Sequence, residues 1–168
     1  MLISNRFPLF HAPALRQQVG ARAYLTDNAL FVDIMAVSAL TSARARDCAI
    51  QSVEINQRYL MSTPSPENFF TAATDCIPRD LKVMKSLSWM RACVFLALYG
   101  LQIGEPHIIH QYLGLYQTLM SLQGLHDERN WPRDIGHIET ETRRRVVRRH
   151  PPESLIKITE YNIVLVSV

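Results

Sequence analysis

The sequence feature that most constrains the fold is a pair of apolar segments separated by a break at Gly104-Glu105-Pro106. In the first segment, apolar residues recur at steps of three and four: Leu87, Met90, Val94, Ala97, Leu98 and Leu101. The second segment has the same spacing, carried by Ile109, Tyr112, Leu113, Tyr116, Leu119 and Met120. This periodicity predicts two helices, with a glycine ending the first and a proline starting the second. Because the connection is short, we expect the two helices to be antiparallel neighbours.

Further helical segments precede this pair. Asp27 can cap a helix whose apolar pattern fades near Thr41, and residues 44–60 form a second amphipathic segment. In that segment we interpret Arg44 and Arg46 as solvated. Ser65-Pro66 then begins a helix over residues 67–76, which ends before Ile77-Pro78 because the residue before a proline avoids the helical conformation.

The two ends of the chain differ from the middle. Prolines interrupt residues 5–16, so we expect an irregular lead-in there rather than a long helix. Residues 137–149 indicate a last helix, which Pro151-Pro152 ends. Beyond it, residues 155–168 are rich in Ile and Val and resemble a strand or an unpaired apolar tail. The predicted fold is therefore all-α, an irregular antiparallel array of helices with a strand-like or disordered tail.

Composition narrows the class of protein. With 168 residues, 48% hydrophobic and 20% charged, the chain can bury a core as one domain or as a piece of a larger one. The net charge of +3 is too small to indicate nucleic-acid binding. An odd number of cysteines without a signal peptide favours reduced thiols inside the cell. The longest apolar run, about residues 92–98, is too short to span a membrane.

Candidate catalytic and metal-binding residues are few. His107 and His110 are three residues apart, with His126 following, but a zinc site needs three or four convergent ligands, and HExxH is absent.

The cysteines, Cys48, Cys76 and Cys93, form no CxxC pair, and Cys93 lies in an apolar stripe where a thiol is usually inert. Tyr99, Tyr112 and Tyr116 fit the edge of a core better than a ligand site. Asp127-Glu128 is too common an arrangement to indicate acid–base catalysis. We therefore assign no catalytic, cofactor-binding or metal residue and expect no enzyme activity.

A cluster of arginines, made of Arg143, Arg144, Arg145, Arg148 and Arg149, follows Glu139 and Glu141. The favoured interpretation is a helix in which Glu139–Arg143 and Glu141–Arg145 pair at four-residue spacing. A second is nuclear import or contact with a nucleic acid. A third is a clamp onto acidic residues elsewhere in a longer protein. The sequence leaves the three interpretations open.

Four motifs occur in a fixed order along the chain: Arg91-Ala92-Cys93, Tyr112-Leu113, Gly124-Leu125-His126, and Glu141 before Arg143-Arg144-Arg145. Together with the opening FPLFHAPALR, they resemble the middle regulatory region of fungal transcription factors, whose N-terminal cluster of six cysteines binds zinc and DNA. The resemblance covers about Phe7 to Arg145. It implies that residues 1–145 belong to an all-helical regulatory domain that acts in the nucleus, without catalysis or a cofactor of its own.

The chain departs from this family in three ways. The six-cysteine cluster is missing, so we expect DNA contact only through a zinc cluster outside this chain. After the arginines, the family's aromatic-rich helix is replaced by residues 146–152. The family region is also longer, so we expect a truncated member with a divergent tail over residues 146–168. Protein partners or self-association are expected, membrane binding is not, and a small-molecule effector stays open. The alternative is a helical protein-interaction module without a transcriptional role.

Overall fold

The computed structural model describes residues 12–47 and 64–148. Within these ranges the chain forms helices and no strand, which confirms the all-α class. The α-helices are α2 (Ala12–Gly20), α3 (Asn28–Arg46), α5 (Pro66–Asp75), α6 (Leu87–Ile103), α7 (Pro106–Leu122) and α8 (His137–Arg148). Short 3-10 turns lie between them: η1 (Ala23–Leu25), η2 (Leu81–Val83) and η3 (Glu128–Asn130).

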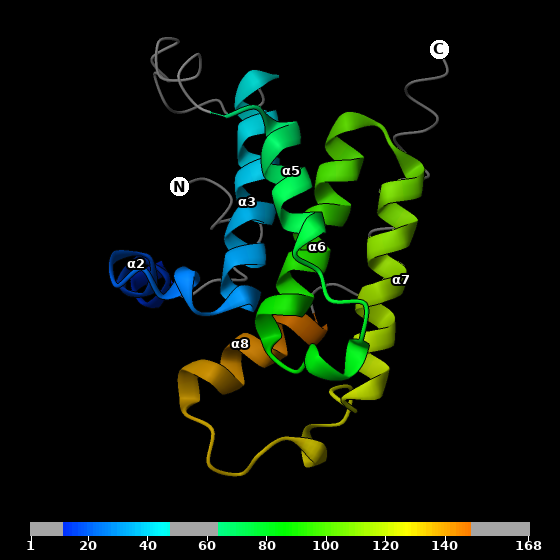
Figure 1. Cartoon of the computed structure of the whole chain (residues 1–168). Helices are drawn as coiled ribbons and strands as arrows, with labels where there is room; N and C mark the ends of the chain where they lie inside the picture. The colour runs from blue at the N-terminus through cyan, green and yellow to red at the C-terminus, as the bar shows by residue number, and fades with distance from the viewer. Residues whose placement is uncertain (1–11, 48–63, 149–168) are drawn as a thin grey trace.

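Helix α6 is the centre of the array. Its side chains are buried without interruption from Ala92 to Gly100, because apolar residues occupy every face of the helix. Helix α3 packs on one side of α6 and α7 on the other, while α5 packs on α3. Figure 1 shows that α3 and α6 run in the same direction, that α5 and α7 run opposite to them, and that α8 crosses one end. The prediction of antiparallel neighbours is confirmed for α6 and α7.

The turn between α6 and α7 forms as its residues predict. Gly104 has a φ of 73°, a left-handed conformation that residues with a Cβ rarely adopt. The Glu105 amide donates to the Gly100 carbonyl at 2.8 Å, which closes the end of α6. Pro106 is the first residue of α7, where its missing N–H has no cost. Ser65 and Pro66 start α5 in the predicted way, and the Asn68 amide donates to Ser65 Oγ at 3.4 Å.

The predicted end of a helix near Thr41 is wrong, because α3 continues to Arg46. The buried face of α3 is lined largely by alanines, including Ala36, Ala39 and Ala43, which fit closely against neighbours but give a weak apolar pattern. Thr41 does not interrupt the helix, since its hydroxyl donates to the Val37 carbonyl at 2.8 Å. Arg44 and Arg46 therefore belong to α3, while residues 48–60 of the predicted second segment lie outside the described ranges.

The start of the chain also differs from its prediction. Residues 12–16 were expected to be irregular, but they are the first part of α2, with Pro13 in its first turn, where proline is tolerated. Phe7, which opens the motif FPLFHAPALR, lies outside the described residues.

At the other end, α8 confirms the predicted helix and continues past Arg145 to Arg148. Val146 is fully buried, so the expected boundary between residues 145 and 146 falls inside a packed helix. Val146 therefore belongs to the described core. Residues 149–168, including the strand-like stretch over residues 155–168, lie outside the described ranges.

Candidate functional site

The histidines do not form a metal site in the described ranges, where no group of three or more His, Cys, Asp or Glu side chains could hold a metal ion. His107 has a side chain that is 71% exposed, and its Nδ1 lies 3.2 Å from Glu105 Oε2. His110 and His126 are exposed as well.

Four of the candidate side chains are core residues: Cys93, Tyr99, Tyr112 and Tyr116. Cys93 is 1% exposed, and burial, with a smaller contribution from Asp33, raises the pKa of its thiol to about 12. Cys93 is therefore protonated at neutral pH and a poor nucleophile. Tyr99 stacks on Phe70 with ring centroids 4.9 Å apart, and Tyr112 meets the same ring edge-on at 6.2 Å.

A buried ion pair joins α3 to α6, and the sequence did not predict it. Asp33 is fully buried, and its Oδ2 accepts hydrogen bonds from Arg91 Nε at 2.8 Å and lies 2.7 Å from Arg91 Nη2. Arg91 Nη2 also donates to Ser88 Oγ at 3.0 Å. Burial raises the pKa of Asp33 to about 7, although Arg91 acts in the opposite direction. The sequence did contain a signal for this ion pair. Asp33 is a carboxylate on the apolar face of α3, at helical spacing from Ala29 and Ala36.

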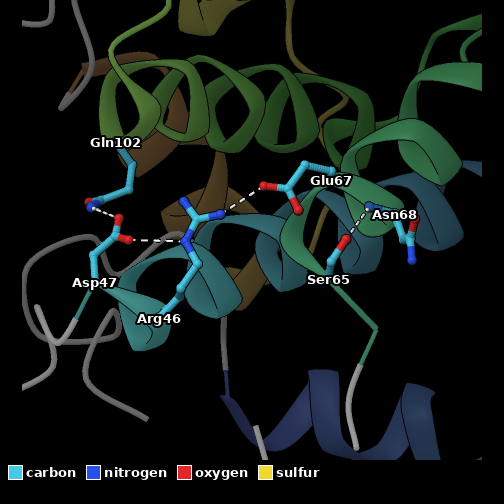
Figure 2. A network of polar contacts seen from close by, with 6 residues as sticks. All are labelled: Arg46, Asp47, Ser65, Glu67, Asn68 and Gln102. Atoms are coloured by element: carbon cyan, nitrogen blue, oxygen red, sulfur yellow. Dashed lines mark hydrogen bonds and ion pairs between the residues drawn. The ribbon is translucent and has the colours of Figure 1, made fainter. Parts of the chain in front are cut away.

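A second polar cluster lies where α3, α5 and α6 meet. Figure 2 shows Arg46 between two carboxylates: its Nε donates to Asp47 Oδ1 at 3.0 Å, and its Nη1 donates to Glu67 Oε1 at 2.7 Å. Gln102, near the end of α6, donates to Asp47 Oδ2 at 2.9 Å. Hydrogen bonds from Gln102 and Arg46 lower the pKa of Asp47. Because Arg46 is about half exposed, solvent screens these pairs, and we assign them to tying helix ends together.

The predicted pairs of the arginine cluster are confirmed. Arg143 Nη2 lies 2.7 Å from Glu139 Oε1, and Arg145 Nε lies 3.1 Å from Glu141 Oε1. Arg144 makes a two-point contact with Glu128 instead, through Nη2–Oε2 at 2.9 Å and Nε–Oε1 at 3.2 Å. All three consecutive arginines therefore have carboxylate partners within this chain. This agrees with the favoured interpretation, a helix whose arginines pair with glutamates.

The loop carboxylates also have structural roles. Asp127 Oδ1 accepts from the Arg129 amide at 2.9 Å and so caps η3, while Glu128 holds Arg144 of α8. Next to them, the indole of Trp131 donates to the Leu125 carbonyl at 3.0 Å. Side chains within the connection between α7 and α8 therefore stabilise its conformation. Its two carboxylates, Asp127 and Glu128, both have hydrogen-bond partners in this chain.

The motifs of the family resemblance lie mainly in the core. Ala92 and Cys93 are buried on α6, Tyr112 and Leu113 are buried on α7, and Leu125 is buried in the turn that follows. Comparison of the chain with protein-family models finds no match, and comparisons with curated proteins and with solved structures find none either. In the two described ranges, the helices fall short of the length and apolar character that crossing a membrane requires.

Proposed function

We propose that this chain is a portion of the regulatory domain of a fungal zinc-cluster transcription factor, and that it modulates transcription in the nucleus through contacts with proteins. The observation that carries the proposal is the order and spacing of the four motifs between Arg91 and Arg145. DNA contact would come from a six-cysteine cluster elsewhere in a longer protein, since this sequence has only three cysteines.

The contacts of the motif residues support this proposal. Arg91 holds α6 to α3, Tyr112 packs against Phe70 of α5, and Arg144 holds α8 to the preceding loop. Residues in such positions specify a helical scaffold rather than a catalytic centre. A scaffold is what a regulatory domain needs in order to mask or present an activating segment.

A reporter assay in yeast tests the proposal. The chain is inserted between an unrelated DNA-binding domain and an activation domain, and we expect reporter output several-fold different from that of the same fusion with an inert spacer. Leu119→Asp, which places a charge at a fully buried position of α7, should abolish the effect. Thr118→Asp, at the exposed neighbouring position, should preserve it and is the matched control.

Two outcomes would reject the regulatory role. One is equal reporter output from the insert, the Leu119→Asp variant and the spacer. The other is an effect of the insert that Leu119→Asp leaves intact, because the folded array would then be irrelevant. If the insert has no effect on the reporter but the purified chain binds a protein partner, the alternative of a helical interaction module is favoured.

Nuclear localisation is part of the same proposal and has its own test. A fluorescent fusion of the chain should accumulate in the nucleus of a fungal cell, and a uniformly cytoplasmic signal would count against this. Replacing Arg143, Arg144 and Arg145 with glutamine should leave nuclear accumulation unchanged, since their guanidinium groups are paired with Glu139, Glu128 and Glu141.

A further inference from the structure

The segment before α6 carries positive charges that the described fold leaves unpaired. Arg79, Lys82 and Lys85 are exposed, and their side chains form no ion pair with a residue in the ranges 12–47 and 64–148. The carboxylate among them, Asp80, accepts a hydrogen bond from the Lys82 amide at 2.9 Å and caps η2. Arginines elsewhere in these ranges do have carboxylate partners: Arg46, Arg91, Arg129, Arg143, Arg144 and Arg145. The three cations near η2 are therefore available to a binding partner.

Two exposed apolar side chains lie at the same corner of the fold. Val83 is 58% exposed, and Leu122, the last residue of α7, is 65% exposed. The residues next to them in the sequence are joined, because Gln123 Nε2 donates to the Met84 carbonyl at 2.7 Å, and Figure 1 shows η2 beside the end of α7. A peptide of about six extended residues, roughly 20 Å long, can therefore reach both side chains. We call this group of residues the η2–α7 surface: Arg79, Lys82, Val83, Lys85 and Leu122.

The backbone of the η2–α7 surface is already fixed. Met84 is fully buried, and Leu81 packs against the core. Met84 also accepts the hydrogen bond from Gln123, which ties the segment to α7. A partner that binds a preformed surface loses less free energy to ordering than one that binds a segment without fixed structure. Single exposed apolar side chains are ordinary, but two of them beside unpaired cations on a fixed backbone make a surface suited to binding.

We propose that the η2–α7 surface binds an acidic segment of a partner protein, in which carboxylates are interspersed with bulky apolar side chains. The carboxylates pair with Lys82 and Lys85, and the apolar side chains cover Val83 and Leu122. Burial of the apolar side chains supplies most of the affinity, while the charges select the partner and speed association. The inference names the kind of protein contact that the proposed function requires, and in that respect it rests on the proposed function.

Other occupants fit this surface less well. A second copy of the chain has a net charge of +3, and its carboxylates Glu128, Glu139 and Glu141 are already paired with arginines. A nucleic acid would use the cations through its phosphates but leave the two apolar side chains exposed. Binding to an anionic membrane favours a long amphipathic helix, whereas η2 has three residues.

Fluorescence anisotropy of the full chain with a labelled synthetic peptide tests the proposal. The probe is a peptide in which glutamates are interspersed with leucines. The comparison ligands are polyglutamate of the same length, a single-stranded DNA and vesicles of anionic phospholipid. We expect the mixed peptide to bind most tightly. Equal binding of polyglutamate would overturn the proposal, because the apolar contacts would then contribute nothing, and tighter binding of the DNA or the vesicles would overturn it in favour of another class of partner.

Charge-removing variants test the lysines. Replacing Lys82 and Lys85 with glutamine should weaken peptide binding about fivefold at low salt, because two exposed ion pairs are lost. Replacing Arg22 and Arg133 with glutamine is the matched control, since both side chains are exposed and the same charge is removed outside the η2–α7 surface. Equal weakening in both double variants would show that only the net charge of the chain matters, which would reject the surface.

An apolar variant has its own control. Leu122→Ser should weaken peptide binding about tenfold, because a leucine that is covered on binding is lost. Ile138→Ser removes an apolar side chain that is similarly exposed, at 55%, on the start of α8, which Figure 1 shows on the other side of the array from the end of α7. Peptide affinity should be unchanged in Ile138→Ser, and an unchanged affinity in Leu122→Ser would contradict the proposal.

NMR of the wild-type chain locates the peptide without any substitution. Peptide addition should shift backbone amide resonances of residues 79–85 and 119–124, and shifts confined to other residues would overturn the proposal. The binding assays contain no components of transcription. Failure of the peptide to bind therefore rejects this surface while leaving the reporter result unaffected, and a negative reporter result leaves peptide binding to be measured independently.

Discussion

The phenolic hydroxyl of Tyr116, on α7, donates a buried 2.7 Å hydrogen bond to the backbone carbonyl of Val146, on α8. Val146 is fully buried, and the Tyr116 hydroxyl gives its carbonyl a hydrogen bond inside the core. This contact holds α8 against α7, the α-helix that precedes it.

Tyr116→Phe should destabilise the fold by about 0.5–1.5 kcal/mol, because the ring is kept while the buried hydrogen bond to the Val146 carbonyl is lost. Urea unfolding followed by circular dichroism measures the loss. Tyr112→Phe is the control, since the Tyr112 hydroxyl makes no hydrogen bond in the described ranges and its ring contact with Phe70 is retained. Equal losses in the two variants would show that the bond to Val146 is unimportant.

Gly100→Ala should destabilise the pairing of α6 and α7 by about 1–3 kcal/mol, as overpacked core positions do. A Cβ at residue 100 would lie 2.7 Å from Ile108 Cγ2 and 2.9 Å from Ile108 Cβ, so one of the helices must move.

Gly114→Ala is the matched control for this substitution. It lies within α7, and an added Cβ meets nothing within 4 Å. Because alanine favours helix more than glycine does, it should stabilise the fold by about 0.5–1 kcal/mol. Thermal unfolding of both variants tests the pair, and two changes of the same sign would contradict the close approach of α6 and α7.

Arg91→Met leaves Asp33 buried without its cation and should cost up to about 3–5 kcal/mol at alkaline pH, where the carboxylate is ionised. Because Arg91 lowers the pKa of Asp33, the variant's pKa should lie above the wild-type value of about 7, and the cost should shrink as pH falls towards 7 and Asp33 becomes neutral in the folded variant. The double variant Asp33→Leu with Arg91→Met should recover most of the loss, since apolar replacement of a whole buried pair is often neutral or stabilising. Urea unfolding of the wild type and both variants, at alkaline pH and below about pH 7, measures these costs. A cost of Arg91→Met that does not change with pH would contradict the burial of Asp33.

Thiol labelling should distinguish the two described cysteines. In a Cys48→Ser background at neutral pH, Cys76, which is partly exposed, should react first with a maleimide. Cys93 should react only as fast as the fold opens, because it is buried and its pKa is raised to about 12. Mass spectrometry of time points in increasing urea measures both rates, and rapid native labelling of Cys93 would contradict its place in the core.

Local patterns were enough to predict most of the helices. Large apolar side chains at helical spacing marked α6 and α7, and Ser65-Pro66 marked the start of α5. The pairs Glu139–Arg143 and Glu141–Arg145 were also predictable, because partners four residues apart on a helix are neighbours whatever the rest of the fold does. Helix α3 was cut short in the prediction because alanine contributes little to an apolar pattern, although it packs closely.

Contacts between distant parts of the chain were not predictable in the same way. Asp33 and Arg91 are 58 residues apart, and Glu128 and Arg144 are 16 apart. In each case the sequence shows two charged residues, but their pairing depends on how the helices cross. Local spacing in the sequence therefore could not predict the polar contacts of the candidate site that hold the helices together.

The turn at Gly104 has a consequence for how the chain folds. Helices α6 and α7 are consecutive, so closing the loop between them costs little entropy, and their contacts can form early. Helix α3 is made well before α6, its main partner, and α5 lies between the two in the chain. Assembly should therefore begin in the middle of the chain, with the α6–α7 hairpin as the nucleus onto which the earlier helices fold back.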